Sequence, residues 1–312
     1  MRRFALLLLP ALLVGSLAAC SNDSSSSLPD VSGKYGAKPK ITVDKGTAPS
    51  KKLDYTVLSE GDGPKVKKGD LLVADYLGAV YKSGKVFDNS YDRKVPAAFP
   101  IGTGKVIAGW DTSLVGVKAG SRVLMVVPPK DGYGKKGNTQ AGIKGTDSLV
   151  FVVDVIASYP KSGIPQKNTP VATLPKGLPT VTGPTGAEPA VAVAKGTAPP
   201  KKPTVTVLAK GTGPAVANGK LAIVQYNAVS WDGTPLSSTW TKGADGTVPG
   251  PQGVPIGAGQ QGNPFDLLVG VPSGSRVLLT LPAQTGENAA AKSVAVAIDV
   301  LAVQGTAKES AK

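Results

Sequence analysis

Few side chains in this sequence could take part in conventional acid–base or nucleophilic chemistry. The chain of 312 residues contains no histidine, and its single cysteine is Cys20. These two facts exclude histidine-based triads, histidine metal sites, disulfides and zinc clusters from the folded part of the protein. Any catalysis must therefore depend on other groups, and we expect no cofactor and no metal ion.

The residues with the strongest chemical signal are aromatic, together with one carboxylate. Trp110 and Tyr133 lie in glycine-flanked segments, where another backbone could approach closely. A buried tryptophan or tyrosine also needs a partner for its N–H or O–H group. Asp88 could accept hydrogen bonds beside such rings, or it could be an ordinary turn residue. Taken alone, several apolar residues are more typical of a core than of a binding site, namely Phe87, Phe99, Val106, Ile107 and Phe151.

Short strands must position these residues. Glycine (39) and proline (27) are abundant, and valine-rich alternating segments recur, so we expect an α+β fold that is mostly β. The best helix candidate is the short segment after Trp110, where residues 111–113 offer capping side chains. The strand patterns are clear at residues 71–76, 122–127, 149–156, 221–226, 276–281 and 294–301.

The first residues have the pattern of a lipoprotein leader. A positive start and an apolar run over residues 4–16 precede Leu17, two alanines and then Cys20. The apolar run is shorter than the ~20 residues of a membrane-spanning helix. The thiol of Cys20 would accept a diacylglyceryl group and become the new N-terminus. We therefore expect residues 1–19 to be a signal peptide and the mature chain to be extracytoplasmic, held at the cell membrane by a lipid on Cys20.

The positive charge of the chain does not indicate a nucleic-acid partner. The formal net charge is +14, but the lysines are scattered through loops and linkers. They are not interleaved with aromatic residues as in a single-strand binder. We expect no nucleic acid to bind, and we attribute the charge to an anionic envelope surface or to solubility alone.

Low-complexity segments predict the domain boundaries. The serine-rich residues 21–27 predict a flexible tether, which we extend over residues 20–44. Residues 161–203 mix Pro, Gly, Thr, Ala and Lys without periodicity and predict a semi-extended linker. Residues 304–312 are expected to be a polar tail.

The sequence also repeats itself. Residues 45–49 (Lys-Gly-Thr-Ala-Pro) return as residues 195–199, and residues 120–124 (Gly-Ser-Arg-Val-Leu) return as residues 274–278. Solenoid repeats are only about 20 to 50 residues long, so this longer period indicates a duplicated domain. We call residues 45–160 the first copy and residues 204–303 the second copy.

Several short blocks occur in a specific order in the first copy. They are Gly-Lys-Val-Phe-Asp at residues 84–88, Val-Ile-Ala-Gly-Trp at 106–110, Gly-Tyr-Gly at 132–134 and Leu-Val-Phe-Val-Val-Asp-Val at 149–155. In this order they resemble the FKBP-type peptidyl-prolyl isomerases, the immunophilins that bind tacrolimus. The resemblance covers about 100 residues. It implies a twisted antiparallel sheet wrapped on a short helix, and the repeat implies two such FKBP-like domains.

The resemblance implies a pocket between the sheet and the helix that binds proline-containing polypeptides or a tacrolimus-like macrolide. Trp110 would form its floor, and the Ile107 N–H and the Tyr133 hydroxyl would donate to ligand carbonyls. Asp88 would accept from nearby polar groups. The implied pocket residues are Tyr76, Phe87, Asp88, Phe99, Val106, Ile107, Trp110, Tyr133, Ile143 and Phe151.

The implied reaction needs no nucleophile and no metal. Rotation about an X-Pro bond is slow because resonance keeps the amide planar, with a barrier of about 18–20 kcal/mol. An apolar pocket can exclude water from the amide and fit its twisted form best. The expected activity is therefore peptidyl-prolyl cis-trans isomerisation during the folding of secreted or envelope proteins.

Two departures from the family pattern bear on substrate preference. Ala97 stands where the family usually has an aromatic residue, which predicts a wider pocket mouth. Residues 138–145 also differ from the usual flap. These departures keep open an alternative, a non-catalytic chaperone or protein-binding surface lipoprotein.

The second copy is expected to lack the site. Residues 87–88 become Leu236 and Ser237, and Trp110 falls at or beside residues 263–265. Residues 132–134 become residues 286–288 without a tyrosine, and Phe151 becomes Val296 or Ala297. We therefore expect a degenerate FKBP-like domain with a structural or partner-binding role, and the loop of residues 240–253 is the place to look for a partner.

Overall fold

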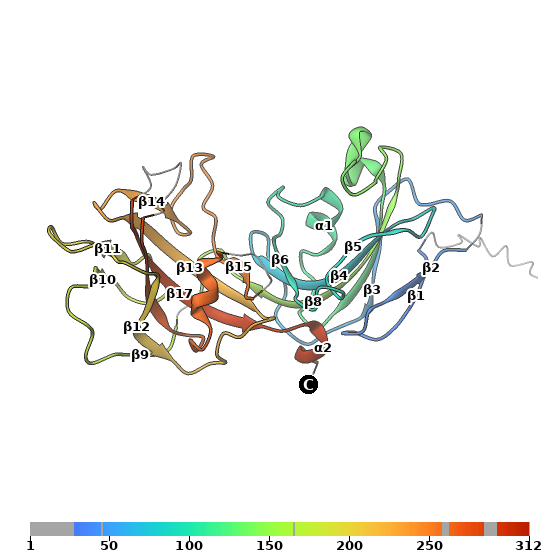
Figure 1. The fold of residues 1–312 in the computed structure, drawn as a ribbon. Coiled ribbons are helices and arrows are strands. Elements are labelled where there is room, and N and C mark those ends of the chain that lie inside the picture. Colours follow the sequence, from blue (N-terminus) through green and yellow to red (C-terminus); the bar gives the residue numbers. More distant parts are fainter. Residues whose placement is uncertain (1–27, 45, 165, 258–261, 284–291, 312) are drawn as a thin grey trace, which may run out of the picture.

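The computed structural model describes residues 28–311 except residues 45, 165, 258–261 and 284–291. The expected leader and Cys20 lie outside the described residues. Two large antiparallel sheets lie side by side, and each is accompanied by a small hairpin (Figure 1). No helix among the described residues is long and apolar enough to cross a membrane.

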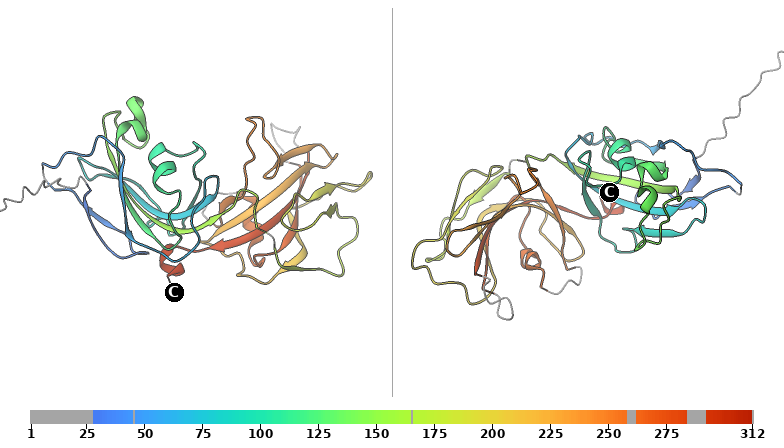
Figure 2. Two further views of the ribbon diagram at one scale, coloured as in Figure 1. Left: turned by 180° about the vertical axis from the view of Figure 1, so that it is seen from behind. Right: turned by 90° about the horizontal axis from the view of Figure 1, so that it is seen from above.

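The first sheet has the strand order β3-β7-β8-β4-β5, and β6 pairs with the other half of β4. Helix α1 lies on the concave face of the sheet (Figures 1 and 2). Trp110 in this helix and Leu114 at its C-cap belong to the main core. The bounds are β3 Asp54–Ser59, β4 Leu71–Val80, β5 Val86–Asn89, β6 Ala97–Pro100, α1 Ala108–Ser113, β7 Arg122–Val127, η1 Pro129–Asp131, η2 Gly134–Lys136 and β8 Leu149–Tyr159.

The second sheet repeats this order, with β12, β13, β14, β15, β16 and β17 in the places of β3, β4, β5, β6, β7 and β8. The register shifts recur at corresponding positions, between Val73 and Ala74 in β4 and between Ile223 and Val224 in β13. An additional strand, β9, pairs with β12. The bounds are β9 Asn168–Pro170, β12 Thr204–Gly211, β13 Leu221–Ser230, β14 Pro235–Ser238, β15 Gln252–Pro255, η3 Pro264–Leu268, β16 Arg276–Leu281 and β17 Val294–Gln304.

Each copy holds a preceding β-hairpin through a buried ion pair. In the first copy, Arg122 binds Asp154 at 2.6 Å and donates to the carbonyl oxygens of Gly33 and Ala37. That hairpin is β1 (Asp30–Ser32) with β2 (Lys40–Thr42). Arg276 and Asp299 repeat the arrangement at 2.6 Å, with the Gly183 carbonyl of the hairpin β10 (Thr180–Thr182) with β11 (Ala190–Ala192) as one acceptor.

These hairpins correct two expectations. The flexible tether expected over residues 20–44 and the semi-extended linker expected over residues 161–203 both contain ordered strands. The composition of these segments is polar and rich in turn residues, but a buried guanidinium supplies donors for backbone carbonyls that a linker would leave to water. The repeat therefore begins near residue 30 and again near residue 180.

The two sheets contact each other through equivalent positions. Leu71, Val73 and Ile156 of the first copy pack against Leu221, Ile223 and Leu301 of the second. Strands β6 and β15 also touch, so closely that a β-carbon at Gly253 would lie 2.5 Å from the Ala98 β-carbon. The contact is therefore reciprocal and apolar at its centre.

The residues that follow the last strand of each copy lie on the other copy. After β17, the short helix α2 (Ala307–Ser310) docks on the first copy, where the buried Ala307 N–H donates to Asp75 at 2.7 Å. After β8, Gly163 lies against Gln225, which occupies the position of Asp75 in the second copy. The polar tail expected at residues 304–312 is therefore wrong for residues 304–311, which end β17 and form the docked helix.

The helix near Trp110 begins earlier than expected. Helix α1 starts at Ala108, and Ile107 is its N-cap without a side-chain cap. Asp111 does not cap the helix; its carboxylate accepts from the N–H groups of Gly102 and Gly104 at 2.6 and 2.7 Å. The carboxylate thus fixes the loop that leads to the helix, which a capping pattern in the sequence does not reveal.

Candidate functional site

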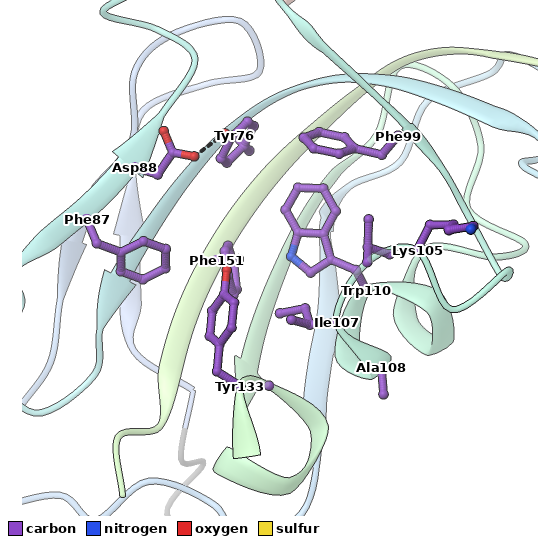
Figure 3. A pocket seen from close by; sticks show the side chains of 12 residues that line it. Tyr76, Phe87, Asp88, Phe99, Lys105, Ile107, Ala108, Trp110, Tyr133 and Phe151 are labelled. Atoms are coloured by element: carbon purple, nitrogen blue, oxygen red, sulfur yellow. Dashed lines mark hydrogen bonds between the residues drawn. The ribbon is translucent and has the colours of Figure 1, made fainter. Parts of the chain in front are cut away.

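An open cavity of about 490 Å³ lies between the first sheet and helix α1 (Figure 3). Strands β4, β5, β6 and β8 supply its ring-bearing residues, and the segments before and within α1 supply its floor. The cavity is lined by Tyr76, Phe87, Asp88, Phe99, Lys105, Val106, Ile107, Ala108, Trp110, Gly132, Tyr133 and Phe151. The structure thus brings together nine of the ten residues that the resemblance implied.

Ile143 is the exception. It is 3% exposed and belongs to the main core, and its backbone pairs with that of Asn138. Ile143 is not among the residues that line the cavity, and its assignment to substrate binding stays a prediction. Conversely, Lys105, Ala108 and Gly132 line the cavity and were not expected there.

Trp110 is the centre of an aromatic cluster on the cavity floor. Its ring lies edge-on to Tyr76, Phe99 and Phe151, at centroid distances of 5.5, 5.0 and 5.4 Å. Edge-to-face pairs of this kind fix the ring positions. The buried Trp110 indole N–H has no hydrogen-bond partner among the described residues, so the floor offers one donor within an otherwise apolar surface.

A polar group lies on one wall of the cavity. The Tyr76 hydroxyl donates to the Asp88 carboxylate, and Arg93 donates to both, at 2.6 Å to Asp88 and 2.9 Å to the Tyr76 oxygen. Burial, together with the Asp88 carboxylate, raises the pKa of Tyr76 to about 12. Arg93 does not line the cavity, and the sequence offered no signal for its role, because its partners lie on β4 and β5.

Ile107 and Tyr133 occupy positions from which they can donate to a ligand. As the N-cap of α1, Ile107 has an N–H outside the hydrogen-bond ladder of the helix. Tyr133 lies between η1 and η2, and its ring stands across the cavity from Trp110 (Figure 3). Burial raises the pKa of the Tyr133 hydroxyl, and a hydrogen bond with Asn138 opposes that rise. The hydroxyl therefore stays protonated near neutral pH.

The corresponding positions of the second copy carry smaller side chains. The register places Val254 opposite Ala222 as Phe99 is opposite Leu72, and Val296 opposite Ala228 as Phe151 is opposite Gly78. Asp266 accepts from Gly257 as Asp111 accepts from Gly102, so Phe265 takes the place of Trp110. Residues 286–288, expected at the position of Tyr133, lie outside the described residues.

No group of three or more His, Cys, Asp and Glu side chains that could hold a metal ion is found in the described part of the chain. The arrangement in the cavity is a set of fixed rings with a few donors at its edge. The fold and the site define a β-sheet protein with a mostly apolar cavity, which has the size and the donors to hold an apolar group that carries a carbonyl.

Comparisons with known proteins identify the family of this chain. Residues 63–156 match the family model described as FKBP-type peptidyl-prolyl cis-trans isomerase. The chain is 34% identical over 120 residues to an "FK506-binding protein" of Streptomyces anulatus, covering 38% of this chain and 96% of that protein. A "Probable FK506-binding protein" of Corynebacterium glutamicum is 32% identical over 121 residues, covering 39% of this chain and 98% of that protein. This protein therefore belongs to the FKBP-type peptidyl-prolyl cis-trans isomerase family.

Two solved structures are also similar in sequence to part of this chain. The crystal structure of AtFKBP13, from Arabidopsis thaliana, is 34% identical and covers 34% of this chain and 91% of that chain, with a TM-score of 0.32. The crystal structure of FkpA from Escherichia coli is 39% identical and covers 35% of this chain and 48% of that chain, with a TM-score of 0.32.

Proposed function

We propose that the protein accelerates the cis-trans isomerisation of X-Pro bonds in secreted or envelope proteins, at the cavity of the first copy. The observation that carries this proposal is the cluster around Trp110, a rigid apolar floor with donors at its edge. A proline ring would rest on Trp110, which would leave the preceding residue free to rotate. A tacrolimus-like macrolide would compete for the same floor.

The mechanism follows from the loss of amide resonance in the twisted transition state. The twisted amide is less planar and less polar than either isomer, so a cavity that excludes water favours it over both. The Ile107 N–H and the Tyr133 hydroxyl would hold the carbonyl groups on either side of the bond. Asp88 would act indirectly, because its carboxylate already orients Tyr76 and Arg93 at the wall.

The test is a double variant of the full chain, Tyr133→Phe with Asp88→Ala, assayed for isomerisation of short Xaa-Pro peptides. We expect kcat/KM to fall at least about tenfold, since each positioned hydrogen bond in a dry site contributes on the order of 1–3 kcal/mol. Val254→Ala, at the Phe99 position of the second copy, is the matched control and should retain full activity. Unchanged turnover in the double variant would show that the cavity is not the catalytic site.

The second copy is, we infer, a degenerate FKBP-like domain that arose by duplication. The shared strand order and register shifts support this inference, as do the smaller residues at the positions of Phe99, Trp110 and Phe151. Its role would then be structural or in partner binding. If the double variant of the first copy keeps substantial activity that Phe265→Ala abolishes, the second copy is catalytic and this inference fails.

The N-terminal pattern supports the further proposal that the protein is a lipoprotein held outside the cytoplasm at the cell membrane through Cys20. A Cys20→Ser variant should leave the membrane fraction. Ser21→Ala is the matched control and should stay in it. Retention of the Cys20→Ser variant in the membrane fraction would contradict lipid anchoring through Cys20.

A binding role without turnover is the second candidate. The observation in its favour is Ala97, which leaves Phe99 as the only aromatic side chain that β6 supplies to the site. In that case proline-containing peptides would bind to the wild type, and binding would be lost in the double variant, while the isomerisation rate would equal the uncatalysed rate.

A further inference from the structure

A second cavity, of about 320 Å³, lies beside the candidate active site and is built from both copies. The first copy and the residues just after β8 contribute Thr103, Lys105 and Lys161, and the second copy contributes Asp245, Val248 and Gln252. Lys105 lines this cavity and the candidate active site alike. In Figure 3 its side chain points away from Trp110. The two cavities therefore share one wall.

The second-copy wall is a loop that has no counterpart of equal length in the first copy. Ser90 and Thr239 correspond, since each hydroxyl accepts from the tyrosine N–H of its copy, and Pro100 corresponds to Pro255. The residues between these positions are therefore more numerous in the second copy. The additional residues reach the mouth of the first-copy site, where Asp245 pairs with Lys105 at 3.3 Å.

The loop is held in a defined conformation. Its backbone closes on itself between Gly243 and Thr247 at 2.9 Å, and Gly250 donates to Thr239 at 2.9 Å. Gly250 has a φ of +74°, and a β-carbon there would lie 3.1–3.3 Å from the backbone and Cγ of Lys161. The loop thus packs directly against the residues that follow β8 and does not project freely from the second sheet.

The charges of the second cavity are unbalanced. The Asp245 carboxylate accepts from the N–H and hydroxyl of Thr247 and from Lys105, and these contacts lower the pKa of Asp245 to about 2. Lys161, by contrast, makes no ion pair within the described residues. Two lysines and one carboxylate that is already engaged leave a net positive wall. That wall would attract a carboxylate from a ligand.

We propose that the loop of residues 240–252 and Lys161 form an additional subsite of the first-copy active site, which binds an acidic side chain of the client chain flanking the proline. This proposal rests on the proposed isomerase function. The second copy would then contribute to substrate selection in the first copy without binding a proline itself. An extended client crossing from the Trp110 floor past Lys105 would place its flanking residues between Lys161 and Asp245.

The test compares a short Xaa-Pro peptide, which fills only the Trp110 cavity, with longer peptides carrying acidic or lysine residues before or after the Xaa-Pro bond. At low ionic strength we expect the full-length protein to prefer an acidic flank on one side over the matching lysine flank by roughly three- to fivefold in kcat/KM. Lys161→Glu should abolish or reverse this preference and leave turnover of the short peptide unchanged. Lys161→Arg should preserve the preference.

The matched control is Lys201→Glu, which changes the net charge equally at an exposed lysine outside the second cavity. The proposed subsite is wrong if Lys201→Glu loses the preference for an acidic flank as Lys161→Glu does. It is also wrong if Lys161→Glu keeps that preference. Absence of short-peptide turnover in the wild type would instead refute the proposed isomerase. Equilibrium binding of the same peptides to the same variants would then show, independently of turnover, whether Lys161 selects an acidic flank.

Discussion

The backbone of Gly78 lies directly against the ring of Phe151, so that a β-carbon at Gly78 would be 2.7 Å from Phe151 Cε1. The same β-carbon would also be 2.7 Å from the Phe87 ring. Two walls of the cavity therefore depend on the absence of one methyl group. In the second copy Ala228 occupies this position, opposite Val296.

Gly78→Ala should displace both rings and reduce the isomerase activity. Overpacking of this kind typically costs about 1–3 kcal/mol, which we expect in the free energy of unfolding measured with urea. Ala228→Gly is the matched control at the equivalent position, and it should cost no more than ~1 kcal/mol, from backbone entropy. A fully active and stable Gly78→Ala variant would show that the rings have room to move.

Arg93→Met should lower kcat/KM for short Xaa-Pro peptides by about three- to tenfold. The guanidinium holds Asp88 and the Tyr76 hydroxyl together, and its loss would let the wall of the cavity relax. Stability should change by less than ~1 kcal/mol because the pair is half-exposed. Lys38→Met breaks another exposed ion pair of 2.6 Å, away from the cavity, and should leave activity intact. Equal effects of the two variants would contradict this role.

Arg276→Met should destabilise its copy more than Arg122→Met does. Each change leaves a buried carboxylate without its main partner, which typically costs about 3–5 kcal/mol. Asp154 would still accept from the Gly36 N–H at 2.7 Å and the Tyr91 hydroxyl at 2.9 Å. Asp299 has no such additional donor within the described residues. Urea unfolding followed by tryptophan fluorescence measures both losses, and a larger loss for Arg122→Met would contradict the comparison.

Asp75→Asn should remove a specific pH dependence of stability. Burial raises the pKa of Asp75 above its ordinary value of 3.8, despite hydrogen bonds from Ser90 and the Ala307 N–H. The folded protein therefore holds this proton more tightly, and the stabilisation present below 3.8 is lost as the pH rises through the raised pKa. The unfolding free energy of the wild type, measured relative to Asp75→Asn, should thus fall with rising pH.

Asp92→Asn is a control variant, for which the pH dependence of the unfolding free energy should run in the opposite direction. The hydrogen bond from Lys38 lowers the pKa of Asp92, so its stabilisation is present above 3.8 and is lost as the pH falls through the lowered pKa. Parallel pH profiles for the two variants would contradict the burial of the Asp75 carboxylate.

The sequence alone predicted the long strands and most of the cavity. Alternating and continuous apolar runs located β7 and β16 with their observed bounds and located the starts of β4, β8, β13 and β17. Nine of the ten residues that the resemblance implied line one cavity. Strands β3, β5 and β6 were not predicted, because strands whose side chains are exposed or half-exposed have no distinctive apolar pattern.

The errors concern segments whose conformation depends on distant partners. Residues 28–44 and 180–193 have the composition of linkers, yet Arg122 and Arg276 hold them as hairpins from about 90 residues away. Likewise, helix α2 is ordered by Asp75, a residue of the first sheet. Composition reports only what a segment can bury by itself, so it does not reveal a buried guanidinium supplied by another strand.

What the sequence determined by itself is therefore the family, the strand periodicity and the residue types of the cavity, because these depend on local patterns and spacing. Only the tertiary structure decided that Arg93 joins Tyr76 and Asp88, that Ile143 faces the core, and that Asp245 lies beside Lys105. Those relationships depend on how strands pair and how the two sheets pack. Such long-range contacts are set by the fit of whole surfaces, and no short segment encodes them.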